Sequence, residues 1–267
     1  MQFWTMTHVK TLLPSLAVML ALAVLLRLLL KGKSERARMI PFQVVASLIA
    51  VLEIIKQIRS LALGYDLWHL PFHVCSVITV CLPLMAFYRG RYQQALRGVT
   101  VAFSAGLFVL MLIIPNGIYS DGAIQCAFQD FGDFHITVFH TLAMAAFVLI
   151  FALELHVPHL RCDMRATLVV MTCYCTVASV MAHILKTNYH NFYRCILEPV
   201  EQLRLAFCEA LGAFAGQVLY VVLFSIVNIL GVLAAYFLYD ALWRLMQRVH
   251  APAHTSAQDS GNGLVQQ

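Results

Sequence analysis

The sequence predicts an all-α polytopic membrane protein, a seven-helix transmembrane bundle. The first observation is composition: 61% of the 267 residues are hydrophobic and 12% are charged, whereas soluble domains carry about 25% charged residues. The second is that the hydrophobic residues form seven runs, each long enough to cross a bilayer, about 17–25 residues. Because these runs nearly exhaust the chain, we expect one transmembrane domain over residues 1–245 and a disordered polar tail over residues 246–267.

The seven runs give the expected helices in order. They lie at roughly 12–30, 39–58, 68–87, 98–115, 134–155, 164–184 and 213–240. The first run is longer than the apolar core of a signal peptide, and Lys31-Gly32-Lys33 follows it where a small-residue cleavage site would stand. We therefore expect this run to be retained as the first spanning helix.

Lysine and arginine residues are distributed unequally between the connections of these helices. One side carries eleven and the opposite side five. The eleven are Lys31, Lys33, Arg36, Arg38, Arg89, Arg91, Arg97, Arg161, Arg165, Arg244 and Arg248. The positive-inside rule then places the N-terminus outside and the C-terminus in the cytoplasm, at the inner membrane if the source is bacterial. The net charge of +5 reflects this orientation, so we expect no nucleic-acid partner.

The second helix carries a polar face near its outer end. Glu53, Lys56 and Gln57 lie on that face because they are spaced at i, i+3 and i+4. Two interpretations stay open. Either Glu53 and Lys56 form an ion pair at the membrane interface, or the Glu53 carboxylate orients a histidine on a neighbouring helix.

The third helix carries imidazoles and a thiol just inside the membrane, where polar groups are costly and usually functional. His69 and His73 share a face at i and i+4, whereas Cys75 is turned by about 200° from His73, at 100° per residue. Cys75 therefore needs a partner from another helix. In the fifth helix, His140 lies at the depth of Cys75, ~9 Å below the outer surface, and His135 lies higher, at the mouth of a site.

Two further polar residues lie at a similar depth. His183 is near the outer end of the sixth helix, and Asn188 follows in a polar and aromatic segment. The acidic connection 116–133 is long enough to form a cap above these side chains.

Three more features concern packing. We expect the connection 154–164 to be a solvated cytoplasmic turn and not a metal site. Gly212 and Gly216, spaced as G-x-x-x-G, permit close approach of a neighbouring helix. Cys126 and Cys195 lie in expected outer loops, where disulfides persist. A bridge between them and two unpaired thiols both stay open, because the sequence does not give the Cα separation.

The segment Leu70-Pro71-Phe72-His73-Val74-Cys75-Ser76 resembles the Leu-Pro-x-His-x-Cys-Ser signature of the YwaF-type integral membrane proteins. The start of the fifth helix, Phe134 to Thr141, and the Thr187-Asn188-Tyr189 segment with Pro199 downstream also resemble that family. The order matches over roughly residues 39–240.

The eukaryotic relatives, the transmembrane protein 164 group, are regarded as acyltransferases. They move fatty acyl chains onto lyso-ether-phospholipids through a cysteine and a histidine. The resemblance implies that Cys75 is the nucleophile and His140 its histidine, with His135 as the alternative. It also implies membrane phospholipids or lysophospholipids as partners. We expect no cofactor and no metal.

This chemistry is consistent with the residue types. A thiol can carry an acyl group as a thioester, which divides a difficult transfer into two steps. An apolar surrounding disfavours the thiolate, so Cys75 needs an imidazole such as that of His140. Glu53 is placed to hold the other nitrogen of that imidazole, as in a catalytic triad.

Two other functions stay open. A metal-dependent seven-helix lipid hydrolase would bind zinc through His73, His135, His140 or His183, although no two histidines of the last three helices have H-x-x-x-H spacing. A non-enzymatic transporter or small-molecule binding protein would use the polar residues as a vestibule. The sequence lacks the repeat between halves that is typical of many transporters.

Overall fold

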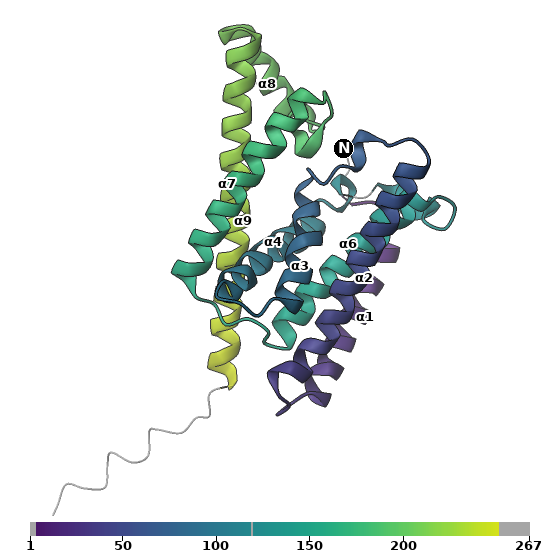
Figure 1. The fold of residues 1–267 in the computed structure, drawn as a ribbon, viewed down its shortest axis with the longest axis vertical. Coiled ribbons are helices and arrows are strands. Elements are labelled where there is room, and N and C mark those ends of the chain that lie inside the picture. The colour runs from purple at the N-terminus through teal and green to yellow at the C-terminus, as the bar shows by residue number, and fades with distance from the viewer. Residues whose placement is uncertain (1–3, 119, 251–267) are drawn as a thin grey trace, which may run out of the picture.

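The computed structural model describes residues 4–118 and 120–250, which form helices and connections without a β-strand (Figure 1). Six helices in this part of the chain are long and apolar enough to cross a membrane. They are α1 (Met6–Leu29), α2 (Glu35–Ala62), α4 (Gln93–Ile113), α6 (Phe131–Ala152), α7 (Leu160–Ile184) and α9 (Ala213–His250). The prediction of an all-α polytopic membrane protein is confirmed.

The seventh predicted span is a shorter helix. α3 (Val74–Phe87) has 14 residues, about 21 Å at 1.5 Å per residue, and it begins six residues later than expected. The 3-10 turn η1 (Leu67–His69) precedes it. Leu70 is extended because the residue before a proline is disfavoured in the helical conformation. His73 is the extended N-cap of α3, so His69 and His73 do not share a helical face.

α4 lies at the centre of the bundle. It contacts α3, α6, α7 and α9, while α2 packs against α3 and α6. In Figure 1, α1, α2 and α6 lie side by side on one flank, and α7 and α9 form the other. Every residue from Gly98 to Ala105 is buried. Gly98, Ala102 and Ala105 are small, which allows neighbouring helices to approach closely.

The connection between α4 and α6 contains its own helical elements. These are η2 (Pro115–Gly117) and α5 (Asp121–Cys126). Ser120 caps α5 by accepting a hydrogen bond from the Ala123 N–H at 3.2 Å. α5 packs against α1 and α6, so this connection covers one end of the bundle.

The segment before α9 holds a helix that the apolar pattern did not predict. α8 (Glu198–Leu211) follows η3 (Tyr189–Asn191) and packs against the start of α9. Gly212 turns the chain with φ 83° and ψ 155°, a region that is nearly exclusive to glycine. A Cβ at Gly216 would overlap the backbone of Phe207 and Cys208. Gly216 therefore permits the close approach of α8 to α9. Gly212 instead forms the turn between these two helices.

A buried polar cluster joins α7 to α9 at the end of the bundle where α7 begins. His156 Nε2 lies 2.8 Å from Asp163 Oδ2, and the Tyr236 hydroxyl donates to the same oxygen. The Tyr239 hydroxyl donates to the His156 carbonyl at 2.8 Å. His156 and Asp163 are 1% and 0% exposed. The prediction of a solvated turn over 154–164 is wrong for these two residues, because α4 and α9 cover them.

Two further expectations concern the loops and the tail. Cys126 and Cys195 are free thiols, as are the other six cysteines, so of the two open alternatives the structure has the unpaired thiols. α9 continues to His250, five residues beyond the expected end of the domain at 245. Residues 251–267 of the expected disordered tail lie outside the described residues.

Candidate functional site

Several polar side chains meet at the end of the bundle where α2 ends and α6 begins. We call this group the polar layer; its members are Glu53, Gln57, His69, His73, Cys75, His135 and His140. They come from α2, from the non-helical segment before α3, from the first turn of α3, and from α6.

Glu53 occupies the middle of the polar layer. Its Oε1 accepts a hydrogen bond from Gln57 Nε2 at 2.8 Å and lies 2.7 Å from Lys56 Nζ. Its Oε2 lies 3.4 Å from His135 Nε2, without the alignment of a hydrogen bond. Glu53 therefore forms the ion pair with Lys56 and also lies beside a histidine. That histidine is His135.

His140 is oriented by the backbone of its own helix. Its Nδ1 lies 2.7 Å from the Ile136 carbonyl oxygen. A carbonyl only accepts, so a neutral His140 carries its proton on Nδ1 and its lone pair on Nε2. The His73 and His135 rings are close enough to act electrostatically on His140. We expected the Glu53 carboxylate to hold one nitrogen of this imidazole. In the structure the Ile136 carbonyl holds Nδ1 instead.

Side chains from three elements hold segment 67–73, which consists of η1 and the residues between η1 and α3. Gln57 Nε2 donates to the His69 carbonyl at 2.8 Å, Tyr174 donates to the Phe72 carbonyl at 3.0 Å, and Tyr189 donates to the Leu67 carbonyl. Non-helical backbone at membrane depth is tolerated where protein satisfies its polar groups. These three donors allow α3 to begin as late as Val74.

Gln57 is itself held by Tyr65, whose hydroxyl donates to Gln57 Oε1 at 2.6 Å. Burial and the nearby Glu53 charge raise the pKa of the Tyr65 hydroxyl, so this group is a neutral donor near pH 7. His69 Nδ1 lies 2.8 Å from Ser60 Oγ. The layer is therefore tied to the final turns of α2.

The late start of α3 places Cys75 in the first turn of a helix. The half-buried thiol packs against the apolar core, which disfavours a thiolate. Opposing this, the backbone N–H groups of Cys75 and Ser76 and the positive charge of Lys56 act on the thiol. The first turn of a helix also favours an anion.

His73 is the N-cap residue before Cys75. Its ring lies 4.3 Å from the Trp68 ring and 5.4 Å from the Tyr189 ring, measured between centroids. Its Nε2 is buried and has no hydrogen-bond partner among the described residues. Ring contacts and a backbone hydrogen bond with Trp68 hold the imidazole, which leaves Nε2 available for a proton or a ligand.

His183 and Asn188 lie in other networks. His183 bonds to the Ser179 carbonyl and to Gln217 Nε2, at 2.7 Å and 3.0 Å. Gln217 also accepts from Arg204. Asn188 Oδ1 accepts from the Arg194 N–H at 3.2 Å. The structure thus uses both residues to hold the η3 and α8 region against α9, and neither contacts a side chain of the polar layer in the described interactions.

Sequence reasoning missed Tyr174 and His190. Tyr174 lies in the middle of α7, where a buried tyrosine hydroxyl needs a partner; that need was the available signal. His190 has φ 48° and bonds through Nε2 to Asn228 Oδ1 at 2.9 Å. No sequence pattern relates a loop histidine to an asparagine 38 residues later.

A protein-family model matches residues 3–239, nearly the whole chain. The chain belongs to the TMEM164 family. The TMEM164 match covers the polar layer and all helices up to the last part of α9, which confirms the resemblance stated from the sequence motifs. No curated protein and no solved structure matches the chain.

The arrangement of donors bears on the zinc alternative. In the part of the chain that the structure describes, no group of three or more histidine, cysteine and acidic side chains has an arrangement that could hold a metal ion. His135 and Glu53 lie together, but no third such side chain joins them among the described residues.

Proposed function

We propose that this protein is a membrane-embedded phospholipid acyltransferase that uses Cys75 as its nucleophile and a histidine of α6 as its base. The observation that carries the proposal is the position of Cys75. It stands at the start of α3, inside the polar layer, which holds imidazoles and the Glu53 carboxylate and lies beside the Lys56 ammonium group. Ionisable groups in such a place are costly and mark functional sites.

The reaction proceeds in two balanced steps. The base takes the thiol proton, the sulfur attacks the ester carbonyl of a phospholipid, a C–S bond forms and the ester C–O bond breaks. The base then protonates the departing lysophospholipid oxygen. In the second step the hydroxyl of another lysophospholipid attacks the thioester, its proton passes to the base, and the Cys75 thiol is restored.

Two histidines can serve as the base. His140 has its lone pair on Nε2, because the Ile136 carbonyl holds Nδ1. His135 faces the Glu53 carboxylate. This carboxylate would stabilise a His135 imidazolium, as the aspartate carboxylate of a catalytic triad stabilises its histidine. We assign the base to His140, and we assign charge stabilisation to Glu53 and His135.

The experiment uses purified protein in phosphatidylcholine vesicles that contain a radiolabelled acyl donor and a lysophospholipid acceptor. We expect label in the acceptor with wild type, none with Cys75→Ala, and near-normal transfer with Cys81→Ala, a matched cysteine deeper in the same helix. Hydroxylamine should release label from trapped wild-type protein. Full transfer by Cys75→Ala would overturn the covalent mechanism.

The orientation belongs to the same proposal. The eleven cations near one set of connections support an N-terminus outside and a cytoplasmic C-terminus. The polar layer then opens toward the outer leaflet.

A further inference from the structure

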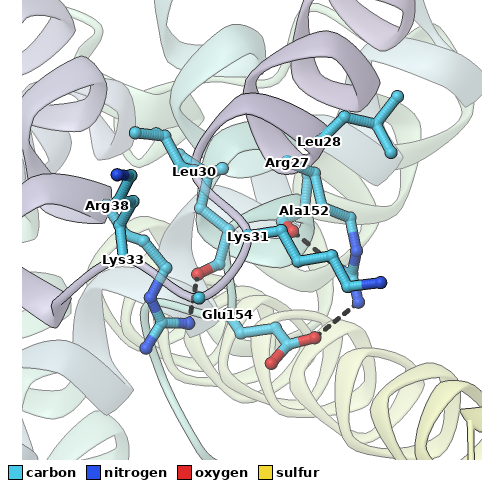
Figure 2. Close-up of a pocket in the computed structure, with 10 residues that line it drawn as sticks. Arg27, Leu28, Leu30, Lys31, Lys33, Arg38, Ala152 and Glu154 are labelled. Atoms are coloured by element: carbon cyan, nitrogen blue, oxygen red, sulfur yellow. Dashed lines mark hydrogen bonds and ion pairs between the residues drawn. The ribbon is translucent and has the colours of Figure 1, made fainter.

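A cavity of about 500 Å³ opens at the end of the bundle opposite the polar layer (Figure 2). It lies where α1 and α6 end and α2 begins. Four cations and one carboxylate are among its lining residues, for a formal charge of 4 − 1 = +3. They are Arg27, Lys31, Lys33, Arg38 and Glu154.

The two arginines hold the floor of this cavity. Arg27 donates to the Ala152 carbonyl at 2.8 Å and pairs with Glu154 Oε1 at 2.6 Å. Arg38 donates to the Leu153 carbonyl at 3.0 Å. Figure 2 shows both side chains reaching the end of α6. Carbonyl groups at a helix C-terminus repel an anion. Here the arginines donate hydrogen bonds to two of these carbonyls, which reduces that repulsion.

Three positive charges remain uncompensated around the cavity. Arg27 is paired with Glu154. Among the described residues Arg38 forms no ion pair, the Glu35 carboxylate one turn earlier pairs with Arg97, and Arg38 Nε is buried without a hydrogen-bond partner. The ammonium groups of Lys31 and Lys33 also have no hydrogen bond or ion pair within the described chain. These side chains therefore present hydrogen-bond donors without acceptors around a space large enough for a phosphate group and part of the alcohol esterified to it.

The position and the remaining lining decide between possible anions. The cavity lies at the ends of three spanning helices, which is the level of the phosphate groups of a bilayer. Leu28, Leu30 and Leu153 add apolar walls beside the cations. A soluble anion gains no favourable contact from apolar walls, whereas the glycerol and upper acyl carbons of a lipid can pack against them. A guanidinium matches the geometry of a phosphate particularly well.

We propose that this cavity binds the phosphate group of an anionic phospholipid, at a site separate from the polar layer. Arg38 and Glu53 are fifteen residues apart on α2, ~22 Å along the helix axis. A lipid held at Arg38 therefore lies too far from Cys75 to be the acyl donor. Its role is to fix the junction of α1, α2 and α6, and the site does not depend on which face of the membrane it occupies.

The test compares lipid binding by two double variants. Wild type, Lys31→Gln with Lys33→Gln, and Arg36→Gln with Arg91→Gln are each purified in detergent and titrated with phosphatidylglycerol or phosphatidylcholine. Bound lipid is counted by native mass spectrometry, and melting temperature is recorded. Arg36 and Arg91 are exposed cations at the same end of the bundle that do not line the cavity, so they report general surface attraction.

We expect wild type to retain phosphatidylglycerol over phosphatidylcholine and to melt at a higher temperature with it. The Lys31→Gln, Lys33→Gln protein should bind it about 25-fold more weakly, since each lysine contributes about fivefold. The Arg36→Gln, Arg91→Gln protein should bind as wild type does. Equal losses in the two double variants would overturn the site, as would equal retention of phosphatidylcholine by wild type.

Two further measurements distinguish a lipid site from a site for soluble phosphate and from the acyltransferase site. Inorganic phosphate at about 10 mM, well below physiological ionic strength, should neither displace the lipid nor raise the melting temperature. Displacement would identify a site for soluble phosphate instead. Cys75→Ala should retain phosphatidylglycerol as wild type does, so failure of the acyltransferase proposal leaves this result unaffected.

Discussion

The hydroxyl of Tyr174 in α7 donates a hydrogen bond to the carbonyl oxygen of Phe72 over 3.0 Å. This bond joins the middle of one spanning helix to the non-helical residues that lead into another. Tyr174 is one of three side-chain donors to the carbonyl groups of segment 67–73, and Cys75 follows that segment after Val74. The position of the candidate nucleophile therefore depends on a tyrosine about one hundred residues away in the chain.

Removing that hydroxyl tests this dependence. Tyr174→Phe leaves the Phe72 carbonyl unpaired in an apolar surrounding, which costs about 1–3 kcal/mol. We expect a lower melting temperature and a fall in acyl transfer. Tyr193→Phe is the control, because Tyr193 is an exposed tyrosine of the η3 region. Equal stability of the two variants would show that the segment does not rely on this bond.

The histidine assignment is tested by combining variants. Cys75→Ala, His140→Ala and the double variant should transfer acyl groups at similarly low rates, since residues that act as one catalytic unit are strongly non-additive. His135→Ala should retain more activity than His140→Ala. If His135→Ala is the inactive one and His140→Ala is not, the base is the histidine beside Glu53.

Close packing of α4 against α7 predicts a specific glycine effect. A Cβ at Gly98 would overlap the Asp163 carboxyl group, whereas a Cβ at Gly231 meets nothing within 4 Å. We expect Gly98→Ala to destabilise the protein by about 1–3 kcal/mol. Gly231→Ala should be neutral or slightly stabilising, because alanine is the better helix former. Denaturant unfolding in detergent measures both, and matching curves would contradict the packing around Asp163.

The ion pair of α8 predicts a pH effect. Hydrogen bonds from Arg204, at 2.5 Å and 2.9 Å, hold the pKa of Glu201 below its usual value. A depressed carboxyl pKa stabilises the fold above the unfolded pKa, about 4.3, and this contribution is lost as pH falls through the lower folded value. The melting temperature of wild type should therefore fall toward that of Glu201→Gln below about pH 4.3. A constant difference at all pH values would contradict this role.

Orientation is tested by labelling from one side of intact cells. In a protein whose native cysteines are replaced, Phe128→Cys should react with an impermeant maleimide and Arg91→Cys should not. Phe128 is 96% exposed and Arg91 is also exposed, so both are accessible once their side of the membrane is reached. Labelling of Arg91→Cys alone would reverse the proposed topology.

The sequence by itself determined the fold class and most of the spanning helices. Hydropathy is a local property, and a run of apolar residues must cross a bilayer as a helix because its backbone has no other partners. The motif around Cys75 is also contiguous in the sequence, so it indicates family membership without any tertiary information. The order of Glu53, Lys56 and Gln57 on one face followed from helical spacing alone.

Only the tertiary structure decided which groups meet. Glu53 faces His135 and not His140, because the rotation of α6 against α2 is set by packing along their whole length. α3 begins at Val74 because donors on α2, α7 and η3 satisfy the segment before it. His156, in the connection before α7, and Asp163, in the first turn of α7, are buried because α4 and α9 cover them. Each of these outcomes depends on contacts between helices distant in the chain, and a one-dimensional pattern carries no information about which faces meet.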